Sequence, residues 1–249
     1  MKKLVILLGC LLSIAANAQN TEGVATYVRK EHWIKIINRL PFLSQEQKDR
    51  EAQTWKNFED DKGIKMKLTF NPNESLYTYL SDEPEEGGYS WRKSDFFVYR
   101  NFENEKKMDI IEMLGKTYIV EDSLHAPSWK IGDQIKEVAG YVCMKAETED
   151  PIKKQKIVAW FAQDIPVPAG PEFMNSLPGL ILELDVNDGD VVIEATSVVF
   201  RKTTPEELKR PKAKGKKIND AAYDTLLRER IAESMTAHRN PFGWSGIRY

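Results

Sequence analysis

The chain is poor in the residues on which enzyme chemistry most often depends. Its 249 residues include only 2 cysteines and 3 histidines. The histidines, His32, His125 and His238, show no spacing that would indicate a base paired with a thiol. No catalytic residue, cofactor or metal site is therefore predicted, and a non-enzymatic role is favoured.

Long apolar runs and an excess of positive charge are also missing. After residue 19, no stretch approaches the roughly 18 continuous apolar residues of a transmembrane helix, so no membrane-spanning segment is predicted. The 36 basic and 38 acidic residues give a net charge of −2. This balance lacks the basic surface typical of nucleic-acid binding, and no nucleic-acid partner is expected.

The first 18 residues have the layout of a secretory signal peptide. Lys2 and Lys3 precede an apolar stretch, residues 4–14, and Ala16 and Ala18 form a small-residue cleavage site. Export would place the mature chain in the periplasm, at the outer membrane or outside the cell. A lipoprotein signal ending at Cys10 is the alternative, although its apolar core would be shorter than the ~7 to 15 residues expected.

Removal of this leader leaves Cys143 as a single cysteine, which excludes an intramolecular disulfide. The residue lies in an alternating segment, so one interpretation is a small buried apolar side chain in a strand. The other is a thiol or copper(I) site that uses Cys143 with Met144 or Met174. Neighbouring strand residues point to opposite faces, which disfavours Met144 as a joint ligand.

The most strongly patterned part of the chain is the segment 180–200. Alternation of side chains over 180–186 and again over 191–200 predicts two strands. Asp188-Gly189 between them predicts a type I′ hairpin turn, which needs positive φ at both central residues. This register would pair Leu184 with Ile193 and Glu183 with Glu194.

Glu183 and Glu194 form a candidate acid pair with two interpretations. Facing carboxylates can share a proton or hold a cation, as in a carboxylate-dependent hydrolase, for which Asp164 and Glu172 are further candidates. Alternatively, the pair lies on a solvated outer face beside a lysine of the next strand. A lone acid pair identifies no reaction, so the second interpretation is favoured.

A proline-rich connection leads into this hairpin. Pro166, Pro168 and Pro171 lack an amide donor, so this stretch cannot form a central strand. Pro178-Gly179 predicts a type II turn with positive φ at the glycine. The structural motif comprises Leu177, Pro178, Gly179, Leu180, Asp188 and Gly189.

Three segments of this region carry a family resemblance. They are AWF at 159–161, IPVPAGP at 165–171 and SLPGLILE at 176–183. Together they resemble the signature of the GLPGLI family of exported Bacteroidetes proteins, with Ser176 in place of the usual glycine. The resemblance implies an exported, β-rich cell-envelope protein of unassigned function, often encoded near TonB-dependent outer-membrane receptors, with no catalytic residues to carry over.

Short alternating segments separated by turns predict an α+β fold that is mostly β. We expect a curved antiparallel sheet, half-barrel or sandwich-like, within a single domain over residues 19–249. Its first strand is predicted over residues 23–37, with Val24 and Val28 on its apolar face. The basic segment 205–217 is interpreted as a solvated linker.

Two helices are predicted outside the sheet. Ser44 followed by Gln47 has the pattern of a capping box and predicts a surface helix. Asn219 or Asp220 can cap a second helix, which we expect to pack on the sheet and to be followed by an aromatic tail.

The favoured function is a non-catalytic binding or accessory protein of the cell envelope, with an outer-membrane receptor as the expected partner. The alternatives are a carboxylate-dependent hydrolase and a thiol or copper protein acting through Cys143. Candidate binding residues are prolines and aromatics of the connection, the strand before it and the tail, namely Trp160, Pro166, Pro168, Pro171, Phe173, Phe242 and Trp244.

Overall fold

The computed structural model describes residues 21–56, 62–80, 95–243 and 246–249. The predicted signal peptide, Cys10 and Trp244 lie outside these residues. The described chain forms one 12-stranded sheet. Its strands are β1 (Gly23–Glu31), β2 (Ile64–Phe70), β3 (Glu74–Tyr79), β4 (Phe96–Asn101), β5 (Lys106–Met113), β6 (Lys116–Ser123), β7 (Lys130–Val138), β8 (Tyr141–Asp150), β9 (Gln155–Ala162), β10 (Leu180–Val186), β11 (Val191–Phe200) and β12 (Lys216–Ile218).

The strand order across the sheet is β12-β6-β5-β4-β3-β2-β1-β11-β10-β9-β8-β7. Neighbouring strands are antiparallel except for the short β12, which pairs in parallel with β6. The first strand therefore occupies the middle, where it joins a limb made of β2 to β6 to a limb made of β11 down to β7. This arrangement confirms the predicted α+β, mostly antiparallel fold.

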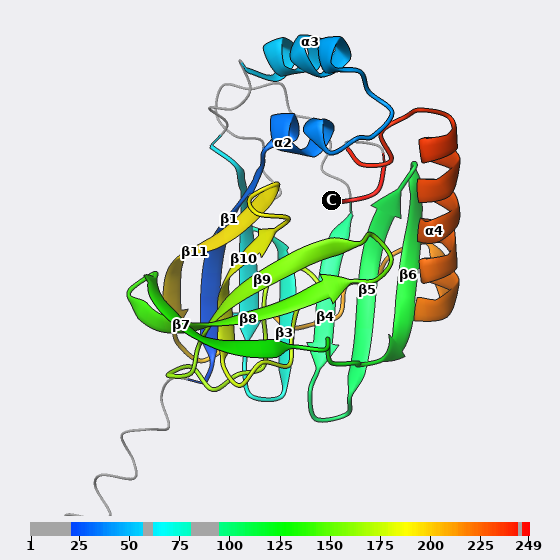
Figure 1. Ribbon diagram of the computed structural model, residues 1–249. Coiled ribbons are helices and arrows are strands. Elements are labelled where there is room, and N and C mark those ends of the chain that lie inside the picture. The colour runs from blue at the N-terminus through cyan, green and yellow to red at the C-terminus, as the bar shows by residue number, and fades with distance from the viewer. Residues whose placement is uncertain (1–20, 57–61, 81–94, 244–245) are drawn as a thin grey trace, which may run out of the picture.

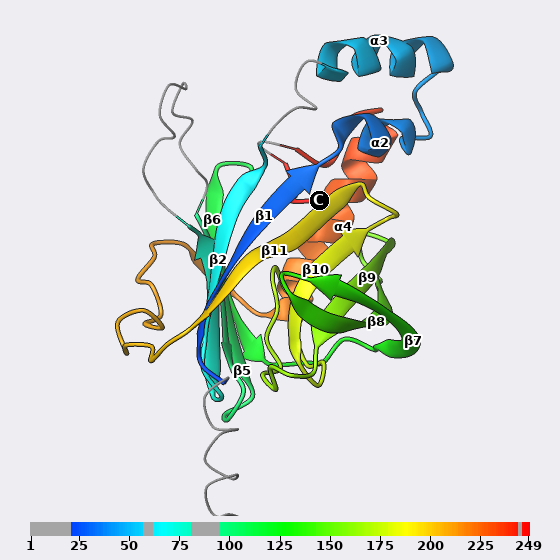
Figure 2. The ribbon, with the colours of Figure 1, turned by 90° about the vertical axis from the view of Figure 1, so that its left-hand side faces the viewer.

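The two limbs curl toward each other around the main hydrophobic core. In Figure 1, β7, β8 and β9 cross in front of β3, β4 and β5, and Figure 2 shows the curl from the side. The core takes side chains from both limbs, including Leu68 and Phe96 from one and Phe161 and Leu184 from the other. Packing of opposite limbs on one core is what closes the sheet into a half-barrel.

The first strand differs from its prediction in length and in face. It ends at Glu31, and residues 33–38 form the short helix α2 (Trp33–Asn38) instead of extending the strand. Ala25, Tyr27 and Arg29 are buried, whereas the valines predicted to face the core are only half-buried. The alternation in the sequence assigned Arg29 to the polar face of this strand. The burial of Arg29 depends on ion pairs that are described below.

The two longer helices begin as predicted. Helix α3 (Gln45–Trp55) has the expected capping box, in which Ser44 and Gln47 exchange hydrogen bonds, and it has no buried residue. Asn219 caps α4 (Asp220–Thr236) by accepting from the amide of Ala222. Helix α4 runs along the β6 side of the sheet, where the rings of Tyr223 and Tyr118 lie 6.4 Å apart.

Residues 201–215 cover part of the other face of the sheet. Leu208 is 3% exposed and packs in a second cluster with Tyr99 and Ile110. Interpretation of this segment as a solvated linker is therefore wrong at Leu208, although its lysines are exposed. A long, apolar helix that could span a bilayer is absent from the described part of the chain.

Candidate functional site

The proline-rich segment lies in the main core. Ile165, Val167, Ala169 and Leu177 are at most 2% exposed. The segment is also held to the start of β10 by backbone hydrogen bonds, from Leu180 N to Ile165 O at 2.9 Å and from Ile181 N to Ala169 O at 3.0 Å. These contacts make the segment part of the scaffold that positions the β10–β11 hairpin.

The candidate binding residues in and near this segment do not gather on one surface. Pro166 is exposed, but Pro168 is half-buried and Pro171 is buried. Phe173 packs edge-on against Phe96, with ring centroids 5.7 Å apart. Phe242 packs against the cluster at β5, β6 and α4, and Trp160 lies on β9 under the ammonium of Lys136.

Gly179 corrects the predicted type II turn. Ser176 has a positive φ of 67°, whereas the φ of Gly179 is not positive. A Cβ atom on Gly179 would lie 2.2 Å from the carbonyl oxygen of Ala162. Glycine is needed here because the backbone of β9 approaches too closely for any side chain.

The β10–β11 hairpin has the predicted register. Glu183 pairs with Glu194 and Leu184 with Ile193. Asp188 and Gly189 have φ of 57° and 92°, but Asn187 also has positive φ at 53°, so the predicted type I′ turn is replaced by a longer loop. The connection is therefore a four-residue loop, closed by a hydrogen bond from Asp190 N to Val186 O at 2.9 Å.

The acid pair is asymmetric. Glu183 is 8% exposed, and both of its carboxylate oxygens accept from Lys136 Nζ at 2.5 Å, whereas Glu194 is exposed. Burial raises the pKa of Glu183, and the hydrogen bond and charge of Lys136 oppose that rise. The solvated-face interpretation is thus wrong for Glu183; it correctly expected a lysine partner, but the lysine comes from β7 and not from the next strand.

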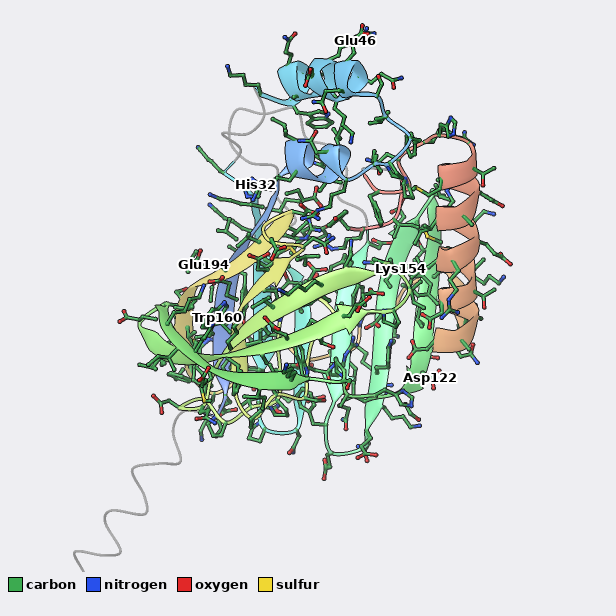
Figure 3. The ribbon with its side chains drawn as sticks, in the orientation of Figure 1. His32, Glu46, Asp122, Lys154, Trp160 and Glu194 are labelled. Carbon is green, nitrogen blue, oxygen red and sulfur yellow. The ribbon has the colours of Figure 1, made fainter. Side chains whose placement is uncertain are left out.

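The same ion pair reports the shape of this limb. Lys136 belongs to β7 and Glu183 to β10, so their contact spans β8 and β9 and requires strong local curl. The ammonium of Lys136 also lies 4.7 Å from the ring centroid of Trp160. Trp160 and Glu194 are labelled on the left-hand part of the sheet in Figure 3. Lys136 and Glu183 thus form an ion pair whose ammonium group lies over the ring of Trp160.

Cys143 is fully buried on β8, directly opposite Lys136 in the neighbouring strand. Burial raises the pKa of its thiol to about 11, with Lys136 and Glu183 acting in opposite directions. Among the described residues, no three histidine, cysteine, aspartate or glutamate side chains gather as a metal site would require. The environment suits an inert, apolar thiol.

A buried charge centre, formed by Arg29, Glu172 and Arg248, was not found from the sequence. Arg248 donates to both oxygens of Glu172, from Nε at 2.7 Å and from a terminal nitrogen at 2.6 Å. Arg29 Nε lies 3.2 Å from the same carboxylate, and Arg29 also pairs with Glu31. One carboxylate thus joins β1, the proline-rich segment and the C-terminal tail.

Electrostatics explain why this centre stays ionised. Burial opposes the charge on Glu172, but Arg248, Arg29 and Lys153 outweigh it and lower the pKa of the carboxyl group. Burial lowers the pKa of Lys153, whose ammonium donates to the carbonyl oxygen of Arg248 at 2.9 Å. Sequence patterns place arginine and glutamate on the surface of a protein. The only sequence feature that pointed to this centre was that Arg29 and Tyr27 lie on the same face of their strand.

An exposed apolar surface lies at the free edge of the sheet. Ile131, Ile135 and Val142 are 48%, 67% and 58% exposed. The pairing of Ile131 with Ala146 and of Ile135 with Met144 puts these side chains on one face of the β7–β8 hairpin. We refer to Ile131, Ile135 and Val142 as the hairpin patch. Sequence alternation gave no reason to expect it, because isoleucine and valine in strands normally face a core.

Comparison with known proteins places this architecture in a context. The family model described as the N-glycanase peptide, N-terminal domain, matches residues 90–225. A solved structure of PNGF-II in a C2 crystal form has a TM-score of 0.54, 16% identity, and coverage of 83% of this chain and 32% of that chain. Its P21 crystal form gives a TM-score of 0.55, again at 16% identity, covering 83% and 33%.

Other matches add little. An uncharacterised conserved protein from Thermus thermophilus covers 86% of this chain and 98% of its own, but at 8% identity and a TM-score of 0.40. A search of curated proteins finds no match. The chain spans about a third of the length of the PNGF-II chains, and the likeness at 16% identity concerns the fold alone.

Proposed function

The chain belongs to the family of the N-glycanase peptide N-terminal domain, and from this premise we propose that it is a non-catalytic binding domain of the cell envelope. The family model describes an N-terminal domain, and the PNGF-II chains that share the fold are more than twice as long. Both observations support a role as one part of a larger functional unit.

The hairpin patch carries the proposal. Three aliphatic side chains that are roughly half-exposed or more lie together on an edge hairpin, and grouped exposed apolar residues are typical of protein-binding surfaces. The partner we propose is an outer-membrane receptor of the TonB-dependent type, as the resemblance to GLPGLI proteins implies. An exported chain would meet such a receptor at the outer membrane.

The alternative activities have less support among the described residues. Glu183 is occupied by Lys136, and Glu172 by Arg248 and Arg29, so neither is free to transfer a proton. Cys143 is buried with a raised pKa, which suppresses the reactive thiolate. These groups are better explained as parts of the scaffold.

The test is affinity capture from detergent-solubilised envelopes of the source organism with the tagged mature protein as bait. We expect stoichiometric recovery of an outer-membrane receptor, identified by mass spectrometry. A variant with Ile131→Thr, Ile135→Thr and Val142→Thr should lose the receptor while keeping strand propensity. Val199→Thr is the matched control, because Val199 is 54% exposed on another strand.

Two results would overturn the proposal. One is recovery of the wild-type protein without a receptor. The other is equal recovery by the wild type and the triple variant, provided that both show the same melting curve.

A further inference from the structure

A pocket of about 350 Å³ opens between α2, α3 and the chain that follows α4. In Figure 1 these three segments meet at the top of the molecule, away from the β7–β8 hairpin. All of the lining residues lie outside the 90–225 family segment, so the pocket belongs to the surrounding parts of this chain. The lining includes Trp33, Phe42, Glu51, Trp55, His238 and Asn240.

Aromatic rings form much of this lining. Trp33 of α2 stacks on Trp55 of α3, with centroids 5.4 Å apart, and Phe42 stacks on His238 at 5.6 Å. These two stacked pairs bring four aromatic rings to the wall of the pocket. The ring faces carry partial negative charge, which attracts a cation within about 6 Å of the centroid.

Among the described residues that line the pocket, Glu51 is the only aspartate, glutamate, lysine or arginine. It is exposed on α3, and among the described residues it takes part in no ion pair. A carboxylate beside several ring faces adds a second attraction for a positive ligand. The charge of the pocket is therefore complementary to an organic cation.

We propose that this pocket binds a quaternary ammonium group of the choline type. Such a group carries positive charge on an apolar surface and has no hydrogen-bond donors, so it loses less on leaving water than a primary ammonium. A neutral sugar is less suited, because the charge of Glu51 attracts a cation and not an uncharged ligand. The volume lies at the lower end of the range for small-molecule sites, which fits a compact head group.

The test is calorimetric titration of the full mature protein with choline and with its uncharged isostere, 3,3-dimethylbutan-1-ol. We expect choline to bind at least about tenfold more tightly, since cation–π attraction and the Glu51 charge act only on the cation. Equal binding of the two compounds, or no binding of choline at millimolar concentration, overturns the proposal. Binding of neutral monosaccharides in place of choline would also overturn it.

Two variants locate the site. Glu51→Gln should weaken choline about tenfold, while Glu46→Gln on the same helix should not, because Glu46 is exposed, pairs with Arg50 and lies outside the lining. Trp55→Ala should abolish binding, and its melting temperature is measured alongside because the ring also stacks on Trp33. Unchanged choline binding in either pocket variant contradicts the assignment.

The source of the ammonium group can be separated in the same protein. Binding of free choline and of phosphocholine, without sedimentation on phosphatidylcholine vesicles, indicates a soluble ligand, whereas cosedimentation that Glu51→Gln abolishes indicates a lipid head group. The hairpin patch plays no part in these measurements, so the pocket and the proposed function can fail separately.

Discussion

Arg248 and Glu172 form a two-pronged ion pair between the C-terminal tail and the proline-rich segment, with nitrogen–oxygen distances of 2.7 and 2.6 Å. The guanidinium also lies 4.0 Å from the ring centroid of Phe96. Their side chains are 16% and 11% exposed, so the pair is largely shielded from water. The tail is thus fastened to the core through a charge as well as through apolar side chains such as Ile247, which is 2% exposed.

Removing one member of this pair should destabilise the fold strongly. We expect Arg248→Met or Glu172→Gln to lower the free energy of unfolding by about 3 kcal/mol, because each leaves a buried charge without its partner. The double variant should lose less than the sum of the single losses. Urea unfolding measures this, with Arg50→Ala in the exposed Glu46–Arg50 pair as a control that should change stability by under ~0.5 kcal/mol.

The same carboxyl group should make stability depend on acid pH. The folded-state pKa of Glu172 is lowered from 4.5, since Arg248, Arg29 and Lys153 together outweigh the effect of burial. Its contribution is therefore present above the unfolded pKa of about 4.3 and is lost as pH falls below that value toward the folded pKa. The difference in unfolding free energy between the wild type and Glu172→Gln should shrink below about pH 4.3. A difference that stays constant down to about pH 3 would contradict this role.

Gly179→Ala should destabilise the protein because the new methyl group would overlap the Ala162 carbonyl oxygen at 2.2 Å. We expect a loss of about 1–3 kcal/mol, as for other overpacked sites. Gly132→Ala is the matched control, since a Cβ there would meet only Lys145 O at 3.8 Å. Thermal melting of the two variants separates close backbone approach from a general effect of replacing glycine. Equal melting temperatures would show that the Gly179 backbone can shift without cost.

Cys143 should resist thiol reagents in the folded state. The side chain is fully buried, and its pKa of about 11 leaves little thiolate at neutral pH. We expect a chromogenic disulfide reagent at neutral pH to label the mature protein only after denaturant is added. Rapid labelling of the native protein would revive the thiol or copper alternative, and copper(I) titration would then be the next measurement.

Local patterns predicted the elements whose causes are local. The β10–β11 register followed from alternation and from a turn that Asp188-Gly189 favours, and α3 began where Ser44 and Gln47 form a capping box. The predicted turn at Gly179 was wrong because glycine can be required either for positive φ or for close approach of another backbone. Sequence shows that a glycine is present but not whether φ or a neighbouring strand requires it.

Long-range features were beyond such patterns. The burial of Arg29 depends on Glu172, which lies more than a hundred residues further along the chain. The valines of β1 were therefore predicted to face the core in place of Arg29. The pocket likewise combines residues 33–55 with residues 238–243. The residue pattern of neither segment predicts that the two lie side by side. The strong curl that brings Lys136 to Glu183 is a property of the whole limb.

The central place of β1 has a kinetic consequence. Its partners are β2, which follows closely in the chain, and β11, whose residues 191–200 emerge much later during synthesis. The two limbs cannot be joined until that distant strand is available. Closing such a long loop costs conformational entropy before stabilising contacts form, which slows folding. The first strand to be made therefore waits longest for one of its neighbours, and its exposed edge is the place where a chaperone would be most useful.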